Sequence, residues 1–148
     1  MANNPINWGN ALNEERQTYF NNLGLLVLRI GISILMLFGH GFDKLVYFGE
    51  KVVNFPDPLG LGSTASLAFT MFGEFFCSLA IAFGFFTRFA TVPMIIIMLV
   101  AIFIIHGDDP WSKKEFATLY LLPYLTLLFT GAGRFSIDRL IFSKRNEP

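Results

Sequence analysis

Residues 34–45, ILMLFGHGFDKL, place ionisable side chains at the end of an apolar run. His40 can gain or lose a proton near neutral pH, and Lys44 follows it by one helical turn on the same face. Further along the chain, Glu74 lies inside the apolar stretch SLAFTMFGEFFCSLAIAFGFF. A carboxylate in such surroundings either pairs with a cation or takes up a proton, and both behaviours suit a proton relay or a polar ligand. Glu74 and His40 are therefore the candidate catalytic residues, and His40, Lys44, Glu74 and Arg29 the candidate ligand-binding residues.

The elements that must position these residues are apolar enough to cross a membrane. The chain of 148 residues is 53% apolar and contains 18 phenylalanines, which is too apolar for an ordinary small soluble domain. A helix needs about 20 apolar residues to span a bilayer, and four stretches approach that length. They are residues 23–42, 66–86, 89–105 and 116–132. The pattern predicts an all-α fold, an integral membrane four-helix bundle.

Two further segments flank the predicted bundle of residues 23–132. Residues 1–22 are polar and precede no short apolar signal core, so we expect the first helix to be retained. The aromatic residues of this segment could lie at the membrane surface, or the segment could be a disordered leader. Residues 133–148 form a cytoplasmic interfacial tail, in which Ser136 can cap a short helix that carries Asp138 in its first turn.

Counting residues along the predicted helices places the candidate side chains at similar depths. At 1.5 Å per residue, His40 lies roughly 9 Å and Glu74 roughly 12 Å from the same side of the membrane. Lys44 could instead extend to the headgroups, and Arg29 could do the same or pair with Glu74. His106 stands beside two aspartates, which favours a solvated turn.

Glycines flank His40 and leave two interpretations open. Gly31, Gly39 and Gly41 could allow close helix packing, or they could leave room for a flat ligand against the backbone. The two interpretations are compatible.

The positive charges predict an orientation. The side expected to be cytoplasmic carries the larger share of lysine and arginine, and both termini would lie there. Its residues are Arg16, Arg88, Arg134, Arg139, Lys144 and Arg145, whereas the opposite side has Lys44, Lys51, Lys113 and Lys114. The cluster around His40 would then open outward. The formal net charge of zero gives no indication of a nucleic-acid partner.

Five short motifs resemble those of the DoxX family, in the same order along nearly the whole chain. They are LRI at 28–30, GHGFDKL at 39–45, Glu74, GFFTR at 84–88 and GAGRFSID at 131–138. DoxX-like proteins are small four-helix membrane proteins of bacteria and archaea, named after a subunit associated with a terminal quinol oxidase and with thiosulfate-to-quinone electron transfer. The resemblance implies a bacterial cytoplasmic (inner) membrane location, and its matching positions are Arg29, His40, Gly41, Lys44, Glu74, Arg88 and the run 131–138.

Two functions from different classes follow. The first is a quinone-linked redox or small-ligand-binding subunit with an outward-facing polar site inside the membrane, which would make the chain part of a membrane oxidoreductase. The second is a non-catalytic structural or assembly subunit of a larger membrane complex. In either case we expect the lipid bilayer and other membrane protein subunits as partners, and no nucleic acid.

The sequence argues against most cofactors. Cys77 is the lone cysteine, which tells against a Cys-x-x-Cys pair and an Fe–S cluster. No ligand spacing for a metal is present. Haem on His40 and His106 is not expected, because His106 should lie in a headgroup turn. Quinone is the cofactor candidate, and none is expected to be covalently bound.

Overall fold

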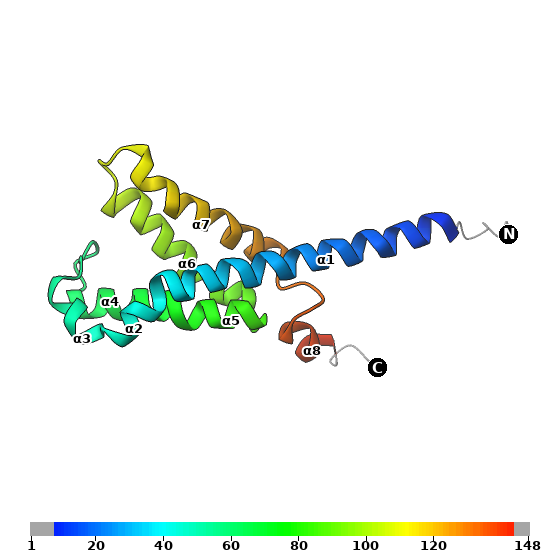
Figure 1. Cartoon of the computed structure of the whole chain (residues 1–148), viewed down its shortest axis with the longest axis horizontal. Helices are drawn as coiled ribbons and strands as arrows, with labels where there is room; N and C mark the ends of the chain where they lie inside the picture. Colours follow the sequence, from blue (N-terminus) through cyan, green and yellow to red (C-terminus); the bar gives the residue numbers. More distant parts are fainter. Residues whose placement is uncertain (1–7, 144–148) are drawn as a thin grey trace.

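The structure is a computed structural model that describes residues 8–143, and every regular element in that part of the chain is helical (Figure 1). The α-helices are α1 (Trp8–Met36), α2 (Phe42–Val46), α3 (Phe48–Lys51), α4 (Ser63–Met71), α5 (Ser78–Phe83), α6 (Thr87–Val100), α7 (Trp111–Thr130) and α8 (Ile137–Ser143). The π-helical turns are η1 (Leu37–Gly41), η3 (Phe72–Cys77) and η4 (Ala101–Ile105), and η2 (Val52–Asn54) is a 3-10 turn.

Three helical stretches in residues 8–143 are long and apolar enough to cross a membrane: Leu12–Val46, Ser63–Phe83 and Thr87–Ile105. Each stretch runs through a π-helical turn, so α1 continues into α2, α4 into α5, and α6 to the end of η4. An unbroken helix satisfies its backbone groups internally, as a lipid environment requires. The prediction of an all-α, multi-pass membrane protein is confirmed.

The fourth long helix, α7, packs against α6 along the bundle (Figure 1). Its first turns carry Lys113, Lys114 and Glu115, so its apolar stretch begins only at Phe116. These charges keep α7 out of the set of helices in residues 8–143 that are long and apolar enough to cross a membrane. The bundle has four long helices, as expected, and three of them are long and apolar enough to cross a membrane.

The bundle packs around a small core and leaves a largely apolar outer surface. Buried at its centre are Met36, Cys77, Ile81, Ala90, Met94, Met98, Tyr124 and Leu127. Large apolar side chains such as Phe103, Phe116 and Phe129 are each more than 70% exposed. In a bilayer such side chains face lipid rather than water, which accounts for a surface that would be costly in a soluble protein.

Helix α1 includes most of the polar N-terminal segment. Helix α1 begins at Trp8, so residue 22 lies inside a continuous helix, which projects beyond the other helices (Figure 1). Residues 1–7 of the polar N-terminal segment, and Lys144 and Arg145 of the tail, lie outside the described residues. The side chains of residues 8–22 are mostly polar and show no apolar periodicity, so the sequence did not indicate this part of α1, although its residues are compatible with a helix.

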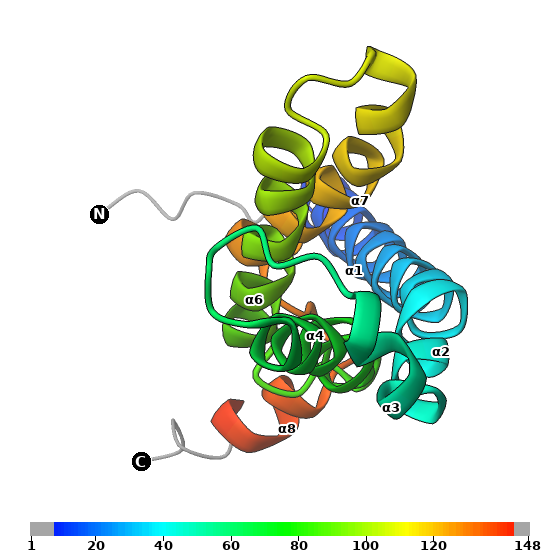
Figure 2. The same cartoon turned by 90° about the vertical axis from the view of Figure 1, so that its left-hand side faces the viewer.

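The two ends of the bundle are built differently. One end, the loop end, carries residues 47–62 and the turn 106–110. The opposite end, the tail end, brings the α5–α6 turn at 84–86 together with residues 131–143 (Figures 1 and 2). The cysteine and the candidate site residues from His40 to Glu74 lie between the two ends or near the loop end.

Candidate functional site

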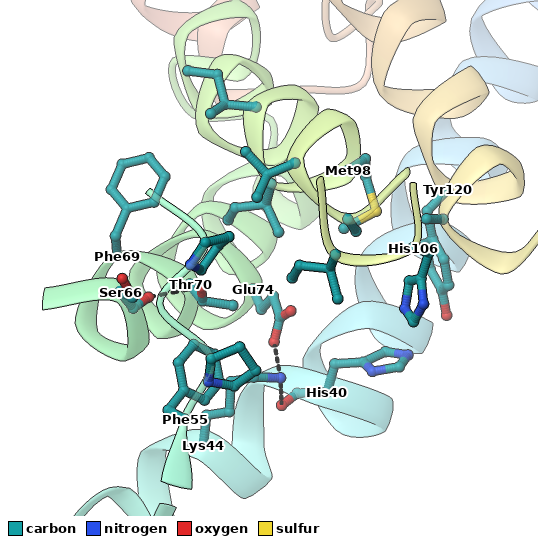
Figure 3. Close-up of a pocket in the computed structure, with 18 of the residues that line it drawn as sticks. His40, Lys44, Phe55, Ser66, Phe69, Thr70, Glu74, Met98, His106 and Tyr120 are labelled. Carbon is teal, nitrogen blue, oxygen red and sulfur yellow. Dashed lines mark hydrogen bonds and ion pairs between the residues drawn. The ribbon is translucent and has the colours of Figure 1, made fainter. Parts of the chain in front are cut away.

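A cavity of about 360 Å³ opens at the loop end of the bundle (Figure 3). The three π-helical turns all contribute to it, through His40 of η1, Glu74 of η3 and Ala101 of η4. π-Helical turns are rare and occur frequently at functional sites, because the extra residue changes the direction of the neighbouring side chains. The walls are mostly apolar, with a few polar side chains among them. Such a combination is typical of small-molecule sites.

Lys44 and Glu74 form an ion pair across this cavity, with Nζ 2.6 Å from Oε2. Both side chains are largely removed from solvent, at 17% and 7% relative exposure. The Lys44 ammonium also points at the backbone oxygen of His40, at 3.4 Å. Since an ammonium has three N–H donors, one donor remains for a bound molecule. Lys44 therefore turns inward to Glu74 rather than outward to the headgroups.

The imidazole of His40 also lies on the cavity wall, against the ring of Tyr120 (Figure 3). The two rings make an edge-to-face contact with centroids 5.7 Å apart. This geometry is favourable for aromatic pairs, and both residues line the cavity. Sequence reasoning did not select Tyr120, which reaches the site from α7; only its position one turn inside an apolar helix could have indicated it.

The segment 55–61 covers part of the cavity and is held by Asp57. Its carboxylate accepts hydrogen bonds from Ser66 Oγ at 2.8 Å and from the backbone N–H groups of Leu61 and Gly62 at 2.9 and 2.8 Å. The Ser66 hydroxyl is the main cause that holds the pKa of Asp57 below its usual range, followed by the Gly62 N–H. Asp57 thus joins the covering segment to the first residues of α4.

A second group of polar residues lies across the cavity. His106 and Lys113 line it, and His106 Nδ1 is 2.7 Å from Asp109 Oδ2 within the turn 106–110. His40 of η1 and His106 of the turn 106–110 thus line the same cavity (Figure 3). Across residues 8–143, no three His, Cys, Asp or Glu side chains are grouped as they would be to hold a metal ion.

Arg29 occupies a different place from the other candidate site residues. It is 2% exposed and donates three hydrogen bonds to backbone oxygens at the tail end: Ala82 at 3.2 Å, Ala132 at 2.5 Å and Phe135 at 2.6 Å. It does not line the cavity, and Glu74 pairs with Lys44 rather than with it. Arg29 ties α1 to α5 and to the residues after α7, so its position supports a structural role.

The glycines around His40 differ in how much space surrounds them. A Cβ on Gly41 would lie 2.5 Å from the backbone oxygen of Glu74, so Gly41 allows η1 and η3 to pack closely. A Cβ on Gly31 or Gly39 would meet nothing within 4 Å. The close-packing interpretation therefore holds for Gly41 alone, and it is this contact that brings the backbone of His40 and that of Glu74 together.

The helices and the cavity define the class: a multi-pass, all-α membrane protein with a cavity of ligand size at one end of its bundle. The chain belongs to the DoxX family, whose sequence profile matches residues 24–107. This match includes Arg29, His40, Lys44 and Glu74 but ends before α7. A protein of Haemophilus influenzae described as uncharacterised is 28% identical over 129 residues, which cover 82% of this chain and 85% of the relative. No solved structure matches the chain.

Proposed function

We propose that this protein binds a lipophilic ligand with a polar headgroup, of the quinone class, as a redox-linked subunit of a membrane complex. The observation that carries the proposal is the cavity, in which the Lys44–Glu74 ion pair stands in an otherwise mostly apolar wall. A buried charge pair is costly to maintain and is a functional hypothesis by default inside a membrane. The volume also falls in the range of about 300–1,000 Å³ found for small-molecule sites.

The polar groups match the chemistry of a quinone ring. Its carbonyl oxygens are hydrogen-bond acceptors, and the free N–H of Lys44, the Tyr120 hydroxyl and a ring N–H of His40 are donors at the cavity wall. The apolar lining would contact the ring face and the start of an isoprenoid tail. Full reduction of a quinone to a quinol takes up two electrons and two protons. In this proposal a redox-active partner subunit supplies the electrons, and Glu74 and His40 carry the protons.

The expected placement in the cell belongs to the same proposal. We place the protein in the cytoplasmic membrane of a bacterium, with both termini in the cytoplasm and the cavity opening outward. In the sequence, six lysines and arginines belong to the side with the termini and four to the side of the cavity, and this excess of positive charge supports that orientation. The six are Arg16, Arg88, Arg134, Arg139, Lys144 and Arg145, and the four are Lys44, Lys51, Lys113 and Lys114. Other membrane protein subunits would contact the apolar outer surface.

A structural or assembly subunit is the second candidate function. The close contact between Gly41 and the Glu74 backbone, together with the Lys44–Glu74 pair, could act as a lock between α1 and the α4–α5 helix. Removing one partner of such a pair leaves a buried charge and is strongly destabilising. On this view Glu74 would matter for accumulation of the protein and not for any ligand.

Quinone binding to the full chain in lipid nanodiscs tests the first function. A short-chain ubiquinone analogue should bind saturably, and His40→Ala and Glu74→Gln should each weaken binding by about tenfold or more, as expected for the loss of one charge-assisted hydrogen bond of about 1.5–3 kcal/mol. Lys44→Ala should be as damaging as Glu74→Gln, because it leaves the carboxylate buried without its partner.

Two residues outside the cavity provide matched controls, the exposed Glu50 and the half-buried Lys51, which pairs with Asp43. Glu50→Gln and Lys51→Ala make the same chemical changes outside the cavity and should leave binding unchanged. Folded Glu74→Gln protein that binds the quinone as tightly as the wild type would refute the ligand function. Failure of the Glu74 variant to accumulate, with no saturable binding by the wild type, would instead favour the structural subunit.

A further inference from the structure

Besides Thr87 at the start of α6, three hydroxyl groups in the middle of the bundle are buried without a hydrogen-bond partner in residues 8–143. They belong to Ser33 on α1, Ser78 on α5 and Tyr124 on α7, and the three residues are 1%, 0% and 0% exposed. We refer to them as the hydroxyl cluster. Buried polar groups are almost always paired, with protein or with ordered water, and an unpaired one costs about 1–3 kcal/mol. The bundle interior also has no bulk solvent to compensate that cost.

Each member of the hydroxyl cluster lies one helical turn deeper than a residue of the cavity. Ser78 follows Glu74 by four residues, and Tyr124 follows Tyr120 by four residues. Ser33 precedes Met36 by three residues, and Met36 also lines the cavity. Residues at these spacings share a helix face. Each of the three helices therefore places one hydroxyl group below the cavity wall, toward the bundle centre.

Contacts toward the cavity and toward the tail end bracket the three hydroxyls along the bundle. On the cavity side, Gly41 touches the Glu74 backbone and His40 packs on Tyr120. On the tail side, Arg29 bonds to the backbone of both α5 and residue 132 after α7. Helix α1 is thus antiparallel to both partners, and the hydroxyl cluster falls between the two sets of contacts. Tyr124 and Ser78 are neighbours, although their hydroxyls do not meet hydrogen-bond geometry.

The residues around the hydroxyl cluster can accommodate a small polar molecule such as water. The core around Tyr124 includes Met36, Met94 and Met98, and these unbranched side chains adapt readily to an irregular space. A water molecule needs two to four polar partners, and the cluster offers three groups that can each donate and accept. By contrast, the equally buried Thr91 already donates to the backbone oxygen of Arg88 at 2.8 Å.

We propose that Ser33, Ser78 and Tyr124 form an internal water-binding site one helical turn below the cavity. The bound water satisfies the three hydroxyls and extends the polar wall of the cavity from Glu74 and Tyr120 into the bundle centre. When Glu74 is protonated, its carboxyl group then has polar neighbours toward the bundle centre as well as toward the cavity. The water site stands on the hydroxyl cluster alone and does not require the quinone function.

Hydroxyl-radical labelling by X-ray pulses tests the site, because buried side chains are oxidised only where a water molecule lies beside them. In the full chain in nanodiscs, Tyr124 should be oxidised although its ring is 0% exposed. Ser78→Ala and Ser33→Ala should each reduce that oxidation by about tenfold, since losing a hydrogen bond of about 1.4 kcal/mol lowers water occupancy by that factor. Thr91→Ala is the matched control and should leave Tyr124 oxidation unchanged.

A stability measurement on Tyr124→Phe gives a second readout. If the cluster were dry, removing an unpaired hydroxyl would leave the melting temperature unchanged or raise it. With water bound, the change leaves that water one partner short and should lower the melting temperature by about 2–4 °C. Absence of Tyr124 oxidation in the wild type, or oxidation that persists in both serine variants, would overturn the water site. A Tyr124→Phe protein more stable than the wild type would also overturn it.

Discussion

Asp138 in α8 caps the first turn of α6, with its Oδ2 atom 2.9 Å from the backbone nitrogen of Thr87. Its other carboxylate oxygen accepts a hydrogen bond from Phe86 N at 2.6 Å. Phe86 adopts a φ of 46°, in the left-handed region that a bulky residue rarely enters. The tail is therefore part of the bundle and holds the α5–α6 turn in its shape.

Replacing Asp138 should destabilise the protein through this turn. Asp138→Ala removes an N-terminal helix cap, which costs about 0.5–2 kcal/mol. Thermal unfolding in detergent should show the decrease, and Asp108→Ala, at an exposed aspartate of the turn 106–110, should change the unfolding temperature little. Equal melting temperatures for the Asp138 variant and the wild type would contradict the capping role.

Arg29 should be essential for stability and unnecessary for ligand binding. Its three carbonyl partners require the planar guanidinium, which a lysine cannot reproduce. We expect Arg29→Lys to lower the free energy of unfolding by about 3 kcal/mol or more, the loss of charge-assisted bonds to buried carbonyls. Quinone affinity of the surviving folded fraction should be that of the wild type. A folded, fully stable Arg29→Lys protein with weakened binding would reverse this assignment.

Gly41 and Gly39 provide a paired test of the contact between η1 and η3. Gly41→Ala should destabilise by about 1–3 kcal/mol, because the added methyl group meets the backbone of Glu74. Gly39→Ala has open space and should be neutral or stabilise the helix by up to about 1 kcal/mol. Chemical or thermal unfolding of both variants measures the difference. Similar stabilities for the two alanine variants would show that the close approach is not required.

The segment that covers the cavity should loosen in acid. The pKa of Asp57 is lowered in the folded chain, first by the Ser66 hydroxyl and then by the Gly62 N–H. The hydrogen bonds therefore contribute fully above the unfolded pKa of about 3.9 and are lost as the pH falls through the lower folded value.

The amide chemical shift of Gly62 reports this transition by NMR. It should titrate at lower pH in the protein than in a free peptide of residues 55–62, and Asp57→Asn should abolish the titration. A midpoint in the protein equal to that of the peptide would refute the Asp57 clamp.

Orientation can be decided with reporter fusions in a bacterial host. Alkaline phosphatase attached after Pro148 should be inactive, because we expect the C-terminus in the cytoplasm. The same enzyme inserted between Leu59 and Gly60, in the segment that covers the cavity, should be active. The opposite pair of activities would place the cavity on the cytoplasmic side.

The sequence predicted the fold and part of the site for identifiable reasons. Apolar length gave the helices, and counting along them placed His40 and Glu74 at a common depth, with Lys44 one turn nearer the outside on the face of His40. The Lys44–Glu74 pair follows from that depth once the two helices are neighbours. The catalytic and ligand-binding roles assigned to these residues stay predictions.

Other features depend on contacts that no local pattern encodes. The partners of Arg29 are backbone oxygens more than fifty residues away in sequence, so neither its charge nor its neighbours indicated them. Tyr120 joins His40 only because α7 folds back beside α1. Gly31, Gly39 and Gly41 are alike in sequence, and only the path of η3 distinguishes Gly41.

Because of the π-helical turn η3, inserting or deleting a single residue in the α4–α5 helix changes the direction of side chains. Each residue of an α-helix advances the direction of the side chains by about 100°. Because a π-helical turn contains about one residue more than an α-helical turn, deleting one residue from the segment Phe72–Cys77 would let it close into a regular α-helical turn. Helices α4 and α5 would then keep their faces, and the side chains inside the turn, Glu74 among them, would change direction. An alignment gap of one residue between two family members at this point would thus mark a change in which side chains face the cavity, even where the flanking residues are identical.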